Sequence, residues 1–242
     1  MATERKGTWS LLDLGLVDYQ EAWDLQLALV KGRQSGGIDR DLVLMLEHPA
    51  VFTLGRRGGR EHLLIPEAKL EHAGIPIVQV ERGGKITYHG PGQLVVYPIL
   101  NLARLNIGVA DYVTALEAVM IQACAGWGIA VERNEANRGI WVGRKKIGSI
   151  GIAVRRDVCF HGMALNVDPD LDPFCWVEPC GLEGVSMTSM QQELDKPVGV
   201  QKVKASVAAA FAAVFNVRLQ PCRPGDLDIS GFDTDERQTR VT

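Results

Sequence analysis

The stretch of the chain that decides its interpretation reads Arg82-Gly83-Gly84-Lys85-Ile86-Thr87-Tyr88-His89-Gly90-Pro91-Gly92-Gln93. It lies between two apolar runs, 75–80 and 94–100. Ordinary strand connections take about two to five residues, so this segment is long for a turn. Its glycines let the backbone approach another group closely, and their N–H groups can line a cavity. A plain glycine-rich hairpin loop is the alternative, but the Arg, Thr, Tyr, His and Gln side chains favour a binding loop.

The composition is that of a globular protein with a sizeable core. Of 242 residues, 46% are hydrophobic and 23% are charged, and the net charge of −3 gives no reason to expect nucleic-acid binding. Residues 1–7 lack the apolar core of a signal peptide, and no apolar run approaches the roughly 20 residues that span a bilayer. We therefore expect a cytoplasmic protein with reduced thiols and no membrane contact.

Helical and strand patterns alternate along the chain. A helix is predicted at 19–32, capped by Asp18, and others at 66–73, 109–126 and 200–215. Strands are predicted at 11–15, 41–47, 51–54, 75–81, 94–100, 129–132, 139–142, 146–154 and 159–167. This order predicts an α/β (α+β) fold with a mixed sheet flanked by helices. With no repeat and no linker, one catalytic domain is expected over 1–242, with its core at about 11–220 and a frayed tail at 221–242.

One of the five cysteines stands out. Cys180 lies in Glu178-Pro179-Cys180-Gly181-Leu182, where proline and glycine predict a turn that can present the thiol. Cys124, Cys159 and Cys175 are interpreted as small core residues, and Cys222 is uninformative. The chain has no Cys-x-x-Cys pair and no histidine pair with ligand spacing, so neither a disulfide framework nor a metal site is expected.

Two further side chains are candidates for a pocket. Lys146 opens an apolar strand, so its side chain can point inward beside the sheet, whereas Arg144 and Lys145 are expected in a solvated turn. His161 interrupts the strand at 159–167, and a lone histidine there is more often structural than catalytic. Glycine beside it favours a pocket wall. His48, His62 and His72 have no constellation around them in the sequence.

The basic loops at 56–60, 144–145 and 155–156 are each expected to be solvated surface. Together they could form a patch for an acidic protein partner. The glycine-rich segments contain neither a Gly-x-x-x-x-Gly-Lys-Ser/Thr phosphate loop nor a dinucleotide-binding fingerprint.

Four blocks of sequence resemble one family. They are Arg82–Gln93 as quoted above, then Lys146-Ile-Gly-Ser-Ile150, His161-Gly-Met-Ala-Leu-Asn166 and Pro179-Cys180-Gly181. These blocks, in this order, resemble the octanoyltransferases, also called lipoyl(octanoyl) transferases or lipoate-protein ligase B. The likeness runs from about Asp13 to Leu219.

The resemblance implies the fold of the biotin and lipoate protein ligase catalytic domains. It implies transfer of an octanoyl group from acyl carrier protein to a lysine of the lipoyl domains of 2-oxoacid dehydrogenases and of the glycine-cleavage H protein, with no cofactor. By position, Cys180 matches the nucleophile and Lys146 its partner. The residues that match the acyl-substrate pocket are Arg82, Gly83, Gly84, Lys85, Ile86, Thr87, Tyr88, His89, Gly148, Ser149, Ile150, His161, Gly162 and Met163.

Two other functions are compatible with the same fold. An ATP-dependent lipoate-protein ligase would bind nucleotide with its glycine loop and would need no nucleophilic cysteine. A non-catalytic carrier-protein binding module would need neither Cys180 nor Lys146. The presence of both residues favours the transferase.

Overall fold

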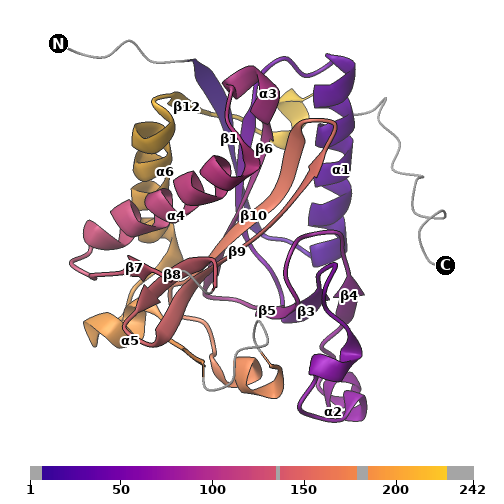
Figure 1. Cartoon of the computed structure of the whole chain (residues 1–242), viewed down its shortest axis with the longest axis vertical. Coiled ribbons are helices and arrows are strands. Elements are labelled where there is room, and N and C mark those ends of the chain that lie inside the picture. The colour runs from indigo at the N-terminus through magenta and orange to yellow at the C-terminus, as the bar shows by residue number, and fades with distance from the viewer. Residues whose placement is uncertain (1–6, 135–136, 179–184, 228–242) are drawn as a thin grey trace.

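A mixed β-sheet forms the centre of the molecule (Figure 1). The computed structural model describes residues 7–134, 137–178 and 185–227. Within them the sheet has nine strands in the order β12-β1-β2-β6-β10-β9-β8-β7, and β11 pairs with β9 beside this path. The strands are β1 (Thr8–Leu16), β2 (Leu42–Glu47), β6 (Gln93–Asn101), β7 (Glu132–Arg133), β8 (Gly139–Val142), β9 (Lys145–Arg155), β10 (Val158–Asn166), β11 (Ser186–Met187) and β12 (Arg218–Pro221). The predicted mixed sheet is confirmed, because β1 is parallel to β2 and β12 while β6, β10, β9 and β8 pair antiparallel.

Helices cover both faces of this sheet. The helix α1 (Tyr19–Ser35) packs on one face, and α4 (Val109–Ala125) and α6 (Val200–Phe215) pack together on the other (Figure 1). Strand β6 contributes to both layers, since Val95, Tyr97 and Ile99 belong to the α1 cluster. Leu94 and Val96 belong to the α4–α6 cluster. This explains why the sequence of β6 shows little alternation: a strand buried on both faces is apolar throughout.

Local signals set the ends of α1. The side chain of Asp18 accepts hydrogen bonds from the backbone N–H groups of Gln20 and Glu21, which have no partner inside the helix. At the other end Gly36 adopts the left-handed conformation with φ of +82°. The predicted cap at Asp18 is confirmed, and the helix continues three residues beyond the predicted end at residue 32.

A second, smaller sheet carries the glycine-rich stretch. Its order is β4 (Ile77–Gln79), β3 (Val51–Leu54) and β5 (Ile86–His89). The prediction of an uninterrupted loop over 82–93 is therefore wrong. Ile86–His89 pairs antiparallel with β3. Its side chains alternate: Tyr88 packs in an apolar cluster on one side, and Thr87 and His89 face the cavity described below on the other.

Other short elements also differ from prediction. The predicted strand at 129–132 lies instead at Glu132–Arg133, since it pairs with β8 only there. The short helix at 66–73 is confirmed as α2 (Glu67–His72). The sequence did not indicate α3 (Leu102–Leu105), α5 (Met190–Leu194), β11 and β12, nor the 3-10 helices at Arg60–His62, Asp172–Trp176 and Pro224–Asp226. Pro221 belongs to β12 and Pro224–Asp226 forms a 3-10 helix, whereas residues 228–242 lie outside the described residues, so the frayed tail stays a prediction.

Candidate active site

A cavity of about 420 Å³ opens between the small sheet and strands β9 and β10. Thirteen of the predicted site residues line it: Arg82, Gly83, Gly84, Lys85, Ile86, Thr87, His89, Lys146, Ser149, Ile150, His161, Gly162 and Met163. The structure thus brings three separate sequence blocks to one cavity. Its volume lies within the range of small-molecule sites, about 300–1,000 Å³.

Two predicted pocket residues lie elsewhere. Tyr88 points to the opposite side of β5, where its ring packs 5.2 Å from Phe52 and 5.4 Å from Phe174, centroid to centroid. Gly148 faces the core, since a Cβ there would lie 2.7 Å from Ile140 and 2.8 Å from the sulfur of Met120. The position of Tyr88 follows from strand alternation, since its neighbours Thr87 and His89 line the cavity.

The predicted nucleophile, Cys180, falls within 179–184, outside the described residues. The chain on either side is described. Before it, Glu178 donates its backbone N–H to the carbonyl of His62 at 2.9 Å. After it, Ser186 and Met187 of β11 pair with Lys145 and Lys146 of β9.

The other cysteines are only partly as predicted. Cys124 and Cys159 are buried, and burial raises the pKa of each thiol to about 12, so both are inert. Cys175 is exposed, so its assignment to the core was wrong. It lies in the 3-10 helix Asp172–Trp176, whose buried positions are Pro173 and Phe174.

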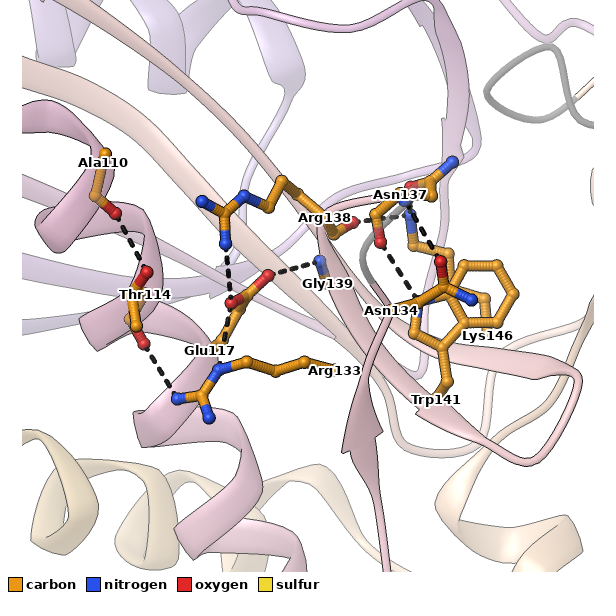
Figure 2. Close-up of polar contacts among 10 residues, drawn as sticks. All are labelled: Ala110, Thr114, Glu117, Arg133, Asn134, Asn137, Arg138, Gly139, Trp141 and Lys146. Atoms are coloured by element: carbon orange, nitrogen blue, oxygen red, sulfur yellow. Dashed lines mark hydrogen bonds and ion pairs between the residues drawn. The ribbon is translucent and has the colours of Figure 1, made fainter.

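Lys146 is buried, as predicted, with 2% of its surface exposed. Its ammonium donates hydrogen bonds to Oδ1 of Asn137 at 2.5 Å and to the carbonyl oxygen of Arg138 at 2.8 Å (Figure 2). Nζ also lies 5.3 Å from the centre of the Trp141 ring. Asn137 and Arg138 line the same cavity, so this ammonium is part of its wall.

A second cation in the wall is held rigidly. The guanidinium of Arg82 donates from Nη2 to the carbonyl and hydroxyl of Thr53, at 2.6 and 2.8 Å, and from Nη1 to the carbonyl of Gly83 at 3.0 Å. Arg82 is 7% exposed. A guanidinium stays protonated at any accessible pH, so this wall keeps a positive charge.

Histidines and tyrosines that the sequence did not connect meet at the cavity wall. His48, for which no constellation was expected, has Nδ1 2.8 Å from the carbonyl of Val17 and Nε2 2.8 Å from the hydroxyl of Tyr97. A carbonyl only accepts, so Nδ1 carries the hydrogen and Nε2 accepts from Tyr97 in the neutral ring. Burial lowers the pKa of His48 to about 4, which keeps the ring neutral at pH 7. Tyr97 stands 49 residues after His48 in the sequence, so only folding reveals this contact.

His89 belongs to this cluster and lines the cavity. Its Nδ1 lies 2.6 Å from Oε1 of Gln93, whose amide nitrogen donates to Asn166 at 2.9 Å. The carbonyl of the glutamine side chain therefore accepts from His89, which is held as one tautomer. Burial, together with the neighbouring His48, lowers the pKa of His89 to about 3.

His161 also lines the cavity wall. Its backbone has φ of +54°, a conformation that costs a residue with a side chain of the order of 1–3 kcal/mol. The side-chain oxygen of Gln26 accepts from its N–H at 2.7 Å, which stabilises this geometry. The ring Nε2 lies 3.7 Å from the carboxylate of Glu81, and burial still lowers the pKa of His161. The next residue must be small, since a Cβ on Gly162 would lie 2.1 Å from the carbonyl of Val96.

The cavity therefore combines apolar walls with a few polar groups. Ile86, Val95, Val113, Ile150, Ile152 and Met163 supply the apolar surface. Two buried cations, Arg82 and Lys146, and neutral imidazoles supply polar groups, and Arg57, Lys85 and Arg138 add further positive residues to the lining. Such a site suits an uncharged chain that ends in a carbonyl group.

Some kinds of site find no support among the described residues. In that part of the chain, no group of three or more His, Cys, Asp or Glu side chains is arranged to hold a metal ion. None of its helices combines the length and apolar character that a membrane span needs. The expected absence of a metal and a cofactor stays a prediction.

Comparisons with known proteins place the chain in a family. The model of the lipoyl protein ligase A/B catalytic domain matches residues 18–212. The octanoyltransferase of Desulfotalea psychrophila is 49% identical over 207 residues, which cover 85% of this chain and 93% of that protein. The octanoyltransferase of Syntrophobacter fumaroxidans is 49% identical over 205 residues, covering 85% and 90%. The chain belongs to the octanoyltransferase family.

The fold of this octanoyltransferase family member agrees with solved structures. A chain from the bipartite lipoate protein ligase of Thermoplasma acidophilum superposes with a TM-score of 0.70, covering 89% of this chain and 87% of that chain at 16% identity. The predicted likeness to lipoate ligase catalytic domains is confirmed for the fold, and the relatives confirm the expected acyltransferase family.

Proposed function

We propose that the protein transfers an octanoyl group from acyl carrier protein to a lysine of lipoyl domains, through a thioester on Cys180. The observation that carries this proposal is the ammonium of Lys146, buried in the wall of an apolar-lined cavity in a chain of the octanoyltransferase family. The acceptors would be the lipoyl domains of 2-oxoacid dehydrogenases and the glycine-cleavage H protein. The solved Thermoplasma ligase was studied with an E2 lipoyl domain.

In the first half-reaction the Cys180 thiolate attacks the thioester carbonyl of the donor. The bond between the acyl carbon and the pantetheine sulfur breaks, and Lys146 gives a proton to the departing thiolate. The products are octanoyl-Cys180, a free pantetheine thiol and a neutral Lys146. Asn137 and the Arg138 carbonyl are neutral acceptors, so neither retains the proton as a carboxylate would.

In the second half-reaction the neutral Lys146 acts as a base. The acceptor lysine attacks octanoyl-Cys180 as an amine, an amide bond forms, and Cys180 leaves as a thiolate. Lys146 takes the proton that the attacking nitrogen loses, which restores the starting ammonium–thiolate pair. A thioester is converted to an amide, so the reaction needs no ATP.

Lys146 alone does not explain the rate. A free thiol with a pKa near 8.5 is already a few per cent thiolate at neutral pH, so full ionisation gains at most roughly 30-fold. Positioning of the acyl carbonyl must supply more, at several kcal/mol. The close pairing of β11 with Lys145 and Lys146 supports such positioning, because β11 follows Cys180 by a few residues.

The cavity rim suits acidic protein partners. Arg57, Lys85 and Arg138 line the cavity, and Arg57 and Arg138 are exposed. Positive side chains around the opening would attract an acidic carrier and raise its association rate. This refines the basic patch expected from the sequence, of which Arg57 is one member.

Substrate dependence tests the proposal. The purified protein is mixed with a lipoyl domain and either octanoyl-acyl carrier protein without ATP, or free octanoate with ATP. We expect octanoyl-lysine only from the carrier-bound donor, and its loss in Cys180→Ala and Lys146→Met. Product from octanoate and ATP alone would establish the ligase instead. Carrier binding without turnover would establish the binding module.

A further inference from the structure

The carboxylate of Glu117 on α4 lies on one side of the segment 137–139, and the ammonium of Lys146 lies on the other side (Figure 2). Glu117 is 0% exposed and does not line the cavity. It accepts hydrogen bonds from the backbone N–H of Gly139 at 3.0 Å, from Arg133 at 3.1 Å and from Arg138 at 3.2 Å. Both arginine side chains are about half exposed, so the buried group of this cluster is the carboxylate.

A single peptide group connects Glu117 to Lys146. The N–H of the Arg138–Gly139 peptide donates to Glu117 Oε1, and the carbonyl of the same peptide accepts from Lys146 Nζ at 2.8 Å. A peptide is planar, so fixing its N–H also fixes the direction of its carbonyl. A negative charge on the N–H side polarises the peptide and makes the carbonyl a stronger acceptor for the ammonium.

The packing at Gly139 shows how closely this peptide fits against Lys146. Gly139 has φ of +124°, a conformation that a residue with a side chain rarely adopts. A Cβ at this position would lie 2.2 Å from the carbonyl oxygen of Gly148 and 2.9 Å from Cε of Lys146. The backbone therefore rests directly on the lysine stem, and a shift of this segment would move the ammonium.

We propose that Glu117 is a positioning residue that sets the orientation and proton affinity of Lys146 through the Arg138–Gly139 peptide. This rests on the proposed function for its effect on catalysis, but not for its effect on the lysine. This link could not be predicted from the sequence, because Glu117 and Lys146 are far apart in the chain and lie on different elements.

The test compares two buried carboxylates. Glu117→Gln keeps the shape, but whichever way the amide faces, an N–H group meets a donor. The matched control is Asp41→Asn: Asp41 is also buried, accepts from the guanidinium of Arg33 at 2.5 Å and from the backbone N–H of Asn101 at 3.0 Å, and lies outside the cavity lining. Both variants lose a buried carboxylate that binds an arginine and a backbone N–H.

The direct readout is the reactivity of Lys146. Trace acetylation with isotope-labelled acetic anhydride is followed by mass spectrometry from pH 7 to 11, with the exposed Lys202 as internal reference. A weaker carbonyl acceptor favours the neutral amine, so we expect the apparent pKa of Lys146 to fall in Glu117→Gln and its reactivity at pH 8 to rise about threefold or more. Asp41→Asn should match the wild type. Equal Lys146 reactivity in Glu117→Gln and the wild type would overturn the proposal.

Kinetics supply the second readout. We expect kcat to fall between about 10-fold and 100-fold in Glu117→Gln, with KM for the donor unchanged, because misplacement by a remote residue has effects of this size.

If Glu117→Gln does not fold, Arg133→Met tests the same cluster, since Arg133 pairs with Glu117 but does not line the cavity. It should shift Lys146 reactivity in the opposite direction, because without this cation the charge of Glu117 acts more strongly on the peptide, and no shift would overturn the proposal. A wild-type protein without transferase activity would refute the proposed function alone, because the labelling does not depend on turnover.

Discussion

Oδ1 of Asn137 accepts a hydrogen bond from the ammonium of Lys146 at 2.5 Å, inside the wall of the cavity. Asn137 is not among the residues that the sequence predicted for the site. Its side chain is uncharged, so it can orient the lysine in both of the protonation states that the proposed reaction needs. This relationship leads to a prediction that separates the two half-reactions.

Asn137→Asp should slow acyl transfer to the lipoyl domain more than formation of the acyl-enzyme. A carboxylate at this distance favours the ammonium and raises its pKa by about 1–3 units, so the neutral base of the second half-reaction becomes scarcer by about tenfold or more. Rapid-quench measurements of each half-reaction test this. Asn106→Asp, at the end of α3, is the control and should leave both rates unchanged. Equal slowing of both half-reactions in Asn137→Asp would contradict the assigned base.

Stability should fall in mild acid because of His48. The pKa of its ring in the folded protein is lowered to about 4, whereas that of a histidine in the unfolded chain is about 6.5. Between these values the unfolded state binds one more proton, so the contribution of His48 to stability is present above about pH 6.5 and is lost as the pH falls to about 4. The loss amounts to about 3 kcal/mol.

Urea unfolding between pH 7.5 and 4.5 measures this contribution. Near pH 5 a buried histidine adds about 1.4 kcal/mol per pH unit to the slope of the unfolding free energy. His48→Gln should reduce the slope by that amount. His72→Gln, on the exposed end of α2, should keep the wild-type slope. The assignment fails if both variants show the same slope.

Filling the cavity should change the choice of donor. Ile150 lines the cavity from β9, and tryptophan there would take up volume that an eight-carbon chain needs. We expect Ile150→Trp to lower kcat/KM for octanoyl-acyl carrier protein at least about tenfold while a butyryl donor is retained, since one methylene is worth about 1–3 kcal/mol in a hydrophobic pocket. Leu64→Trp, at a residue that is 62% exposed, is the control. Unchanged discrimination in Ile150→Trp would show that the acyl chain binds elsewhere.

Long elements were predictable because their signals are local. The side chain of Asp18 caps α1, and the apolar spacing of 109–126 and 200–215 matches α4 and α6. Strand β5 was missed because Ile86–His89 is surrounded by glycines. Its strand conformation depends on pairing with β3, about thirty residues earlier in the chain. Strands β11 and β12 are short and depend on their partners in the same way.

The parts of the site that could be predicted are those in which the type of a residue and its place in a strand together suggest its role. A lysine at the start of an apolar strand indicated the buried Lys146. The groups that bind its ammonium, the Asn137 side chain and the Arg138 carbonyl, are brought to it by folding, and Glu117 is linked to it only through the Arg138–Gly139 peptide. His48 likewise gains its partners, Tyr97 and Val17, only when separate strands and loops meet. Tyr88 shows the opposite error, because the residues of a contiguous motif on a strand alternate between two faces, and Gly148 was wrongly assigned to the pocket because it packs against Ile140 and Met120.

Formation of a covalent intermediate is the most direct test of the central claim. The protein is mixed with octanoyl-acyl carrier protein alone, its intact mass is recorded, and the adduct is mapped by proteolysis before a lipoyl domain is added. We predict one octanoyl group on Cys180, retained in Cys175→Ala, absent in Cys180→Ala, and transferred to the lipoyl lysine without ATP. Cys175 is a matched control because it is exposed and lies five residues away in the chain. Full transfer by Cys180→Ala, or an adduct that the lipoyl domain cannot discharge, would contradict the proposed mechanism.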